Sequence, residues 1–438
     1  MTRDRAMLNA FDPAAADGLD ADARALVARR QRVLAPSYRL FYDHPLHIVR
    51  GEGVWLYDAA GRRYLDAYNN VVSIGHAHPA VVRAIADQAA VLNTHTRYLH
   101  EGILDYAEAL IATMPPELSQ ALFVCTGSEA NDVALRIARA ATSGTGVIVT
   151  QLAYHGVTAA VAEISPSLAP DAPRAPHVRV VRAPDTFRNA DVAAALAQDV
   201  EAAAADLRAH GIAPAALIVD TLFTSDGVFS DPAGFLAPAV AAIRAAGGLF
   251  IDDEVQAGFA RSGSAMWGFQ RHGVTPDLVT MGKPMGNGHP VAAVVGRPEV
   301  LAPFGAEGRY FNTFGGNPVS MAAAMATLRV IQDEGLQVNA ARIGAHLREG
   351  FRALAAAHPV IADVRGDGLF LGVELADTKP RKDLAAAVVN GMRDRGVLIS
   401  ATGVHGNVLK VRPPLVLARE HADLLLETAD AALTAAGA

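Results

Sequence analysis

The chain has 438 residues, of which 51% are hydrophobic and 19% are charged, and its net charge is −7. This length allows a large hydrophobic core and two or three domains. We expect neither nucleic acid nor a membrane as a partner, because the basic residues form no cluster and no apolar run reaches the roughly 18 residues of a span.

The single cysteine, Cys125, excludes an intrachain disulfide and is compatible with a reducing compartment. Residues 1–20 contain no apolar core of the kind found in signal peptides. We therefore expect a cytoplasmic protein.

The N-terminal segment, residues 1–79, begins with a polar, alanine-rich stretch in which one helix is predicted over residues 21–34. Residues 54–70 predict a hairpin, because apolar and aromatic runs flank a turn at Asp58–Gly61. We expect this segment to join the domain formed by the C-terminal part of the chain.

A helix is predicted to begin at Pro79, which suits the first turn of a helix. His76 and His78 precede it, but without further ligands this pair does not predict a metal site.

A predicted strand ends and a predicted helix begins next to Thr126. Residues 121–125 are strand-like, and Thr126 and Glu129 have the spacing of a capping box. Gly127 and Ser128 then open the helix, whose free N–H groups and positive dipole end can seat a phosphate. An ordinary capped connection between a strand and a helix has the same pattern, so both interpretations stay open.

Two further strands end in charged residues. Residues 249–251 are strand-like and lead into the acids at 252–254, which are costly to bury unless a cation meets them. Residues 278–280 form another strand and lead into Lys283. Burial lowers the pKa of a lysine and exposes its nucleophilic form, as a Schiff-base lysine requires. The alternative is a lysine that reaches out to water.

Pyridoxal phosphate (PLP) needs this pair of groups, a lysine on its aldehyde and an acid on its pyridinium nitrogen. The thirty residues from Asp253 to Lys283 leave room for a crossover to a neighbouring strand. Tyr154 and Asp220 also follow strands, and ligands bind at this edge of open α/β sheets. We predict a large, mostly parallel sheet domain over residues 80–319.

The composition changes after this region, and residues 320–438 predict a smaller α+β domain. Strands are expected within residues 361–373 and 408–413, with helices between them.

Five segments together resemble the class III aminotransferase family of PLP-dependent enzymes, and the resemblance runs from about Leu46 to about Leu415. The segments are FVCTGSEAND, AYHG, FIDDEVQAGFARSG, DLVTMGKPMGNGHP and YFNTFGGNP. The resemblance implies an α/β protein of PLP fold type I, like aspartate aminotransferase. It also implies a homodimer with two shared active sites.

The resemblance assigns roles to named residues. Lys283 forms the aldimine with PLP and moves the proton, and Asp253 pairs with the pyridinium nitrogen. Tyr154 and Val255 cover the two faces of the ring, and Gln256 binds its phenolic oxygen. The remaining cofactor-binding residues are Gly127 and Ser128 on the phosphate, His155, and Thr313, which reaches the phosphate of the neighbouring subunit. Asp252 and Glu254 are expected to be structural.

Arg412 in LKVRPPL matches the family arginine that binds a substrate carboxylate, and a guanidinium suits a carboxylate through two parallel hydrogen bonds. Without the family, a surface arginine in a strand would be the default. Asp220 and Thr221 stand where many members have Glu-Pro, so Arg412 is expected to be held differently here.

The leading prediction is transfer of an amino group from an amine or amino acid to a keto acid. The alternative is a phospho-lyase that eliminates phosphate and ammonia from a phosphorylated amino alcohol, because MGKPMGNGHP and RYLHEGILDYAE resemble ethanolamine-phosphate phospho-lyases. No cationic pocket for a second phosphate is identifiable in the sequence. A PLP-binding regulator would need a basic DNA-binding module, which the pattern does not indicate.

Overall fold

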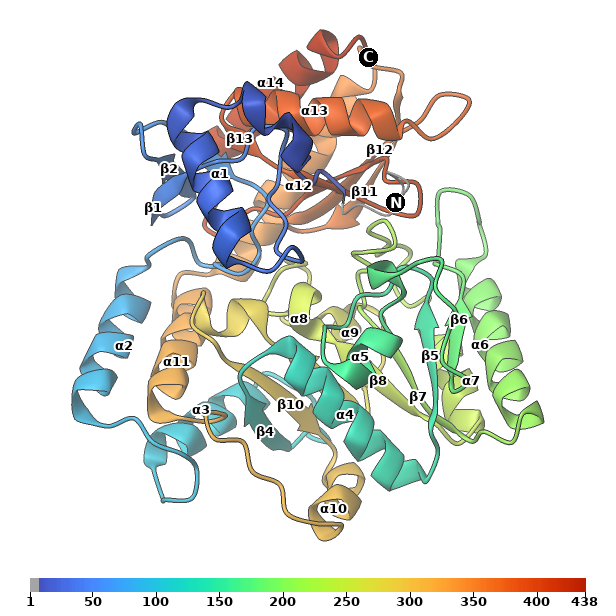
Figure 1. The fold of residues 1–438 in the computed structure, drawn as a ribbon. Helices are drawn as coiled ribbons and strands as arrows, with labels where there is room; N and C mark the ends of the chain where they lie inside the picture. The colour runs from blue at the N-terminus through green and yellow to red at the C-terminus, as the bar shows by residue number, and fades with distance from the viewer. Residues whose placement is uncertain (1–7) are drawn as a thin grey trace.

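The computed structural model describes residues 8–438 of the chain. Figure 1 shows two units: a lower one built on a large sheet and an upper one that contains both α1 (Ala21–Val33), near the start of the described chain, and α14 (Arg419–Ala435), near its end. Within residues 8–438, no helix combines the length and apolar character that crossing a bilayer requires. In the same range, no group of three or more His, Cys, Asp or Glu is arranged to hold a metal.

The lower unit contains a seven-stranded sheet in which β10 alone runs antiparallel to its neighbours β4 and β9. The strands that form its centre are buried along their whole length, as in parallel sheets covered on both faces. In spatial order they are β4 (Gln120–Val124), β10 (Ala292–Gly296), β9 (Leu278–Met281), β8 (Leu249–Asp253), β7 (Pro214–Val219), β5 (Gly146–Thr150) and β6 (Val178–Val181).

Helices cover both faces of this sheet because alternate strand residues point to opposite sides. Ile218 packs on the side of α4, whereas its neighbours Leu217 and Val219 pack on the side of α6 and α7. The helices of this unit are α4 (Gly127–Thr142), α5 (Ala159–Glu163), α6 (Val192–Ala209), α7 (Ala237–Ala245), α8 (Glu254–Ala257), α9 (Gly268–Arg271) and α10 (Pro298–Ala306), with the short η3 (Pro166–Leu168) and η4 (Lys283–Gly286).

Three more helices pack together beside the large sheet: α2 (Pro79–Val91), α3 (Glu101–Ile111) and α11 (Pro318–Asp333). The predicted domain boundary after residue 319 therefore falls in the first turn of α11. Gly335 separates α11 from the next helix, α12 (Leu336–Leu354). The domain bounds themselves stay predictions.

The upper unit combines the two ends of the chain. An antiparallel sheet is formed by β11 (Ile361–Asp367), β12 (Phe370–Leu375), β15 (Val408–Val411) and β14 (Ser400–Thr402), with α12 (Leu336–Leu354), α13 (Lys382–Asp394) and α14 (Arg419–Ala435). A second sheet contains β1 (Ile48–Glu52), β2 (Trp55–Asp58), β3 (Arg63–Asp66) and β13 (Val397–Leu398), and η2 (Pro13–Gly18) and α1 (Ala21–Val33) precede it.

The parallel pairing of β3 with β13 joins the N-terminal segment to the C-terminal unit. The predicted hairpin is confirmed as β2 and β3, and the predicted helix as α1. The predicted fold class is confirmed as well, because one mostly parallel sheet with a smaller α+β unit beside it is what the structure contains.

A buried ion network ties the two units together. Glu374 on β12 contacts Arg188 of the lower unit and lies 2.8 Å from Nη1 of Arg365. Arg365 Nε in turn donates to the carbonyl oxygens of Gly227 and Val228, both at 3.0 Å. Burial raises the pKa of Glu374, but the two arginines outweigh it and hold that pKa below its usual value.

Glu374→Ala should lower the free energy of unfolding by about 3 to 5 kcal/mol, because it removes the buried partner of the Arg365 charge and leaves only the more exposed Asp363. Since the folded-state pKa of Glu374 is lowered, its contribution is present above about pH 4.3 and fades as the pH falls. Chemical denaturation at neutral and acidic pH measures both effects. Asp363→Ala removes the more exposed partner of Arg365 and should cost about 1 kcal/mol or less. Equal losses in the two variants would contradict this account.

Candidate functional site

A pocket lies beyond the carboxyl ends of the central strands, where the lower unit faces the upper one. Apart from Gly156, every residue that lines it belongs to the predicted site. These residues are Gly127, Ser128, Tyr154, His155, Asp220, Asp253, Val255, Gln256 and Lys283. Residues up to 156 positions apart in the chain thus meet because successive βα units end at one sheet edge.

The first turn of α4 forms one wall. Thr126 caps the helix: its Oγ1 accepts from Glu129 N at 3.1 Å, and Glu129 Oε2 accepts from Thr126 N at 3.0 Å. The N–H groups at Gly127 and Ser128 make no intrahelical bond, so they stay available to an anion. A Cβ on Gly127 would lie 2.9 Å from Val255, so glycine keeps this wall open.

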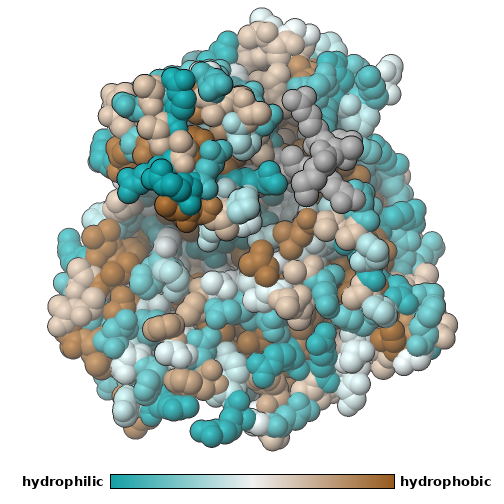
Figure 2. Space-filling model, viewed as in Figure 1, coloured by the Kyte–Doolittle hydropathy of each residue, from teal (hydrophilic) through white to brown (hydrophobic). Residues whose placement is uncertain are grey.

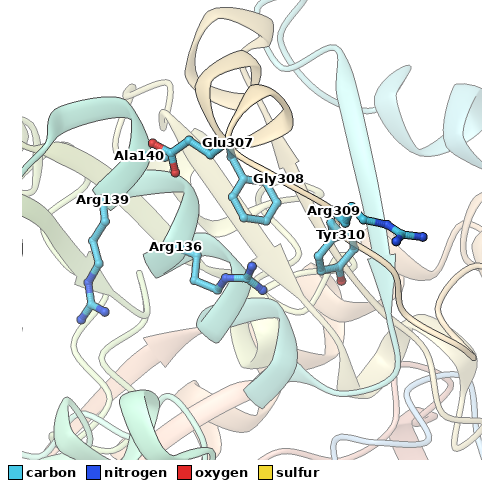
Figure 3. A pocket seen from close by; sticks show the side chains of 8 residues that line it. Arg136, Arg139, Ala140, Glu307, Gly308, Arg309 and Tyr310 are labelled. Atoms are coloured by element: carbon cyan, nitrogen blue, oxygen red, sulfur yellow. The ribbon is translucent and has the colours of Figure 1, made fainter.

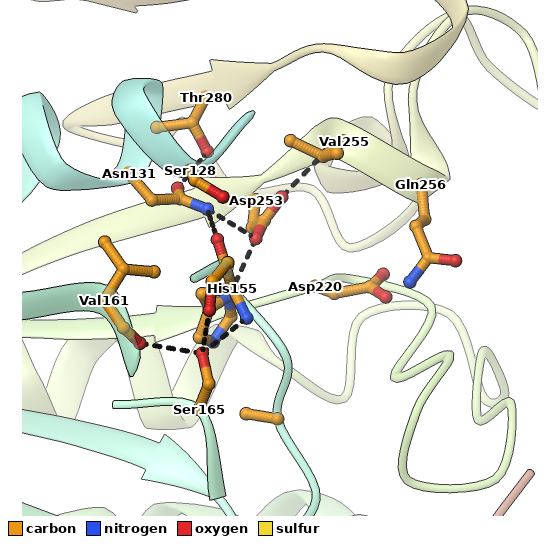
Figure 4. A network of polar contacts seen from close by, with 12 residues as sticks. Ser128, Asn131, His155, Val161, Ser165, Asp220, Asp253, Val255, Gln256 and Thr280 are labelled. Atoms are coloured by element: carbon orange, nitrogen blue, oxygen red, sulfur yellow. Dashed lines mark hydrogen bonds and ion pairs between the residues drawn. The ribbon is translucent and has the colours of Figure 1, made fainter. Parts of the chain in front are cut away.

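The Asp253 carboxylate is held in one orientation by three neighbours (Figure 4). Its Oδ1 accepts from Val255 N at 3.0 Å, and its Oδ2 accepts from Asn131 Nδ2 at 2.9 Å. His155 Nδ1 lies 2.7 Å from the same Oδ2. Because Asp253 is 3% exposed, these bonds replace the water that a carboxylate needs.

Sequence reasoning missed Asn131 and Thr280, which complete this network. Thr280 Oγ1 donates to Asn131 Oδ1 at 2.6 Å, and that bond turns the Asn131 amide nitrogen toward Asp253. The sequence does contain a signal for Asn131. It follows Gly127 by four residues, so it shares a helix face with the phosphate wall.

Asp252 and Glu254 point away from this pocket, as their predicted structural role requires. Glu254 Oε1 accepts from Phe269 N at 2.9 Å, and burial raises the Glu254 pKa to about 7. Burial and the charge of Glu254 raise the pKa of Asp252 well above its usual value. Asp252 and Glu254 therefore tend to hold a proton between them, which makes them poor partners for a ligand cation.

Lys283 begins η4, directly after β9. Burial lowers the pKa of its ammonium, although the negative charges of Asp253 and Asp220 partly oppose this shift. Within residues 8–438, no hydrogen bond or ion pair occupies its Nζ. Lys283 is therefore predisposed to present a neutral nucleophilic amine to the pocket.

Arg412 reaches the pocket through a chain of polar side chains. Its Nη1 donates to Gln256 Oε1 at 2.8 Å, and Gln256 Nε2 donates to Thr224 Oγ1 at 2.6 Å. Thr224 Oγ1 donates to Asp220, which also accepts from the backbone N–H groups of Leu222 and Thr224. Asp220, which stands where many family members have the longer glutamate, thus connects to Arg412 only through Thr224 and Gln256.

Two predicted site residues do not line this pocket: Arg412, which contacts it through Gln256, and Thr313, which lies elsewhere. Thr313 is exposed on the loop between α10 and α11 and does not line the pocket of its own chain. Its contact with another subunit stays a prediction.

A second pocket, at the other end of α4, contains several arginines (Figure 3). There the Arg136 guanidinium packs over Phe304 and Tyr310, with 5.0 and 5.8 Å to the ring centroids. These contacts hold α4 against α10, so the packing of these two helices accounts for the position of Arg136.

The residues in the first pocket fit PLP. The open helix N-terminus at Gly127 would hold the phosphate, and Asp253 would meet the pyridinium nitrogen. Lys283 has an unoccupied amine, and Val255 and Tyr154 lie on the pocket wall where a flat ring would pack. A Cβ on Gly156 would collide with Ser128, so the chain opposite α4 must also stay small. Each of these roles remains a prediction for the individual residue.

Lys283→Met should stabilise the cofactor-free protein by about 1 to 4 kcal/mol at pH 7, because it removes a desolvated ammonium. Because the pKa of Lys283 is lowered in the folded state, the folded wild-type protein binds fewer protons than the unfolded chain does. This holds from the folded-state pKa up to about pH 10.4, the pKa of an unperturbed lysine. The stability of the wild type therefore rises with pH in that window, and the advantage of Lys283→Met should shrink. Denaturation at about pH 7 and pH 9.5 measures the difference. The exposed Lys379→Met is the control, and an advantage independent of pH would contradict the prediction.

The comparisons with known proteins agree with this geometry. The family model described as aminotransferase class-III matches residues 39–433. An alanine–glyoxylate aminotransferase 2-like protein of Drosophila melanogaster is 44% identical, covering 91% of this chain and 84% of that protein. A solved phospholyase from Arthrobacter, in complex with phosphoethanolamine, is 46% identical with a TM-score of 0.90, covering 93% of this chain and 99% of its own.

An ornithine aminotransferase from Toxoplasma gondii has PLP at partial occupancy in its active site. It is 27% identical with a TM-score of 0.81, and the match covers 97% of both chains. The family match and these relatives span nearly the whole chain, and the pocket fits the cofactor. The protein therefore belongs to the class III aminotransferases, and PLP is its cofactor.

Proposed function

We propose that this aminotransferase passes the amino group of an amine or amino acid to a keto acid whose carboxylate binds Arg412. One observation carries the proposal: the polar partner of the Arg412 guanidinium is a neutral amide, Gln256. Within residues 8–438, no carboxylate pairs with it, and its Nε is buried without a partner. A cation held in this way keeps its charge available for a substrate carboxylate.

The other pocket residues have distinct tasks in this reaction. PLP, when bound, supplies an electron sink for the negative charge that develops at the substrate α-carbon. Asp253 would keep the ring nitrogen protonated, and Asn131 and His155 fix its carboxylate for that purpose. Lys283 would take the proton from the substrate α-carbon and deliver it to C4′, the carbon of the cofactor aldehyde, since its lowered pKa allows a neutral amine.

Arg412→Ala should reduce kcat/KM for pyruvate or 2-oxoglutarate, with an amine donor, by about 10- to 100-fold, because a charge-assisted hydrogen bond contributes about 1.5 to 3 kcal/mol. Formation of the new amino acid measures transfer. Arg309→Ala, in the second pocket, is the matched arginine control. Equal activity of Arg412→Ala and wild type with every keto acid would contradict the proposed acceptor site.

A second candidate is elimination of phosphate and ammonia from a phosphorylated amino alcohol. What favours it is the 46% identity to the Arthrobacter phospholyase solved with phosphoethanolamine. The two activities share the same pocket and differ in what happens to the charge at the α-carbon. Release of phosphate from O-phosphoethanolamine without any keto acid, and no transfer in the first assay, would decide for elimination.

We also propose a homodimer in which Thr313 contributes to the partner's site. Thr313 lies on an exposed loop whose neighbours Phe311 and Phe314 are exposed, and Tyr98 and Leu99 add apolar surface. His95 contacts the rings of both Tyr98 and Phe311, so these two loops are adjacent. Figure 2 shows further apolar residues over α2. A surface of this kind supports burial against a second chain.

The dimer proposal predicts complementation between two inactive variants. Lys283→Ala lacks the lysine, and Thr313→Asp should repel the phosphate of the partner's PLP. A mixed dimer would contain one intact site, formed by Lys283 of one chain and Thr313 of the other. Activity should therefore reappear when the two variants are coexpressed. A fully active monomer, or mixed dimers isolated with two tags that stay inactive, would contradict it.

We propose a cytoplasmic location as well. Its support is the single cysteine, Cys125, which is free and suits a reducing compartment.

A further inference from the structure

A second buried cation lies next to Arg412. Lys410 precedes it by two residues on β15, so strand alternation places both side chains on one face of the sheet. In the register of the sheet, Lys410 lies opposite Gly372 of β12 and Ser400 of β14. Lys410 is thus flanked across the sheet by two small residues, a glycine and a serine.

This face of the sheet is turned toward the lower unit. Thr402, which shares the face, donates to the carbonyl oxygens of Thr224 and Ser225 at 3.1 and 3.0 Å. A Cβ on Gly372 would lie 3.1 Å from Val228 and 3.2 Å from the Gly227 carbonyl oxygen. Lys410 therefore lies between the two units, above the segment that carries Asp220 and Thr224.

Lys410 is 6% exposed and has no polar partner among residues 8–438. Its Nζ lies 5.3 Å from the centroid of the Phe370 ring. The charges that act on it most are those of Arg412, Asp220, Lys283 and Asp226. Burial first, and then the positive charge of Arg412, lower the Lys410 pKa well below its usual value.

The two acids of this group are already occupied. Asp226 Oδ2 accepts from Thr150 Oγ1 at 2.6 Å, and its Oδ1 accepts from Leu152 N at 2.8 Å. Asp220 accepts from Thr224 and from two backbone N–H groups. Neither forms an ion pair with Lys410, so a structural ion pair does not account for a desolvated ammonium at this place.

We propose that Lys410 and Arg412 form a two-cation subsite that binds the phosphate group of a phosphorylated amine substrate, and that Lys410 sets the preference for phosphate over carboxylate. The inference rests on the proposed function, since it names the substrate class of the same pocket. It holds whether the phosphate is retained during amino transfer or leaves by elimination.

The chemistry of the two anions explains the preference. A carboxylate has one negative charge and two oxygens, which the Arg412 fork can satisfy alone. A phosphate monoester carries about −1.5 to −2 charges at pH 7 and presents three acceptor oxygens. The third oxygen and the extra charge need a further cation. A bound phosphate favours the protonated form of the desolvated Lys410, because a nearby opposite charge raises the pKa of an amine, and the compact ammonium then serves without a fixed geometry.

The test compares O-phosphoethanolamine with 4-aminobutanoate, in which the same number of bonds separates the amine nitrogen from the central atom of the anionic group, here a carboxylate. Dissociation constants come from the spectral change of the PLP-loaded enzyme on amine binding, so no turnover is needed. In Lys410→Met the ratio of the two constants should shift against the phosphate by about 10- to 100-fold, as expected for one charge-assisted hydrogen bond. Lys410→Arg, which keeps a cation, should restore most of the preference.

Lys379→Met, an exposed lysine on the same unit, controls for the loss of charge. A ratio that Lys410→Met leaves unchanged, or equal weakening of both ligands, overturns the inference and makes Lys410 a structural residue. The phosphate-specific shift supports it even if the wild type transfers no amino group to any keto acid. In that case the proposed transamination fails while the subsite stands.

Discussion

The site depends on one buried carboxylate at the end of a central strand. Asp253 is the last residue of β8, and it is desolvated by the same sheet that forms the core. Asn131, His155 and the Val255 N–H compensate that desolvation and hold the carboxylate in one orientation. Because Asn131 comes from α4, Thr280 from β9 and His155 from the chain after β5, the large sheet must be assembled before this network can form.

The upper unit supplies the other half of the site. Arg412 follows β15 and meets the lower unit through Gln256, so a glutamine that lines the pocket also holds the arginine that we propose for the substrate. The chain Arg412–Gln256–Thr224–Asp220 links both units, with two neutral side chains between the arginine and the carboxylate. An amide partner binds a guanidinium less tightly than a carboxylate does, and a substrate anion can therefore compete with it.

Much of this arrangement was predictable from local patterns. The capping box at Thr126 is present in the structure, the hairpin forms around its predicted turn, and the acids and Lys283 stand at strand ends. Each of these features is encoded within a few residues, by capping, turn chemistry or apolar periodicity. The local patterns alone left two interpretations of the turn at Gly127 open, a phosphate-binding site or an ordinary connection between a strand and a helix. The resemblance to a family then assigned a ligand to that edge of the sheet.

The sequence by itself determined the order of strands and helices and the residues that end each strand. Only the tertiary structure decided which side chains meet: that Asn131 and Thr280 orient Asp253, that Gln256 holds Arg412, and that Lys410 is buried beside it without an ion pair. These contacts join residues of different elements, and their distances depend on sheet register and on how the two units pack. Residue types and spacings along one chain do not contain that information, because a side chain's solvation and charge partners exist only after distant segments have come together.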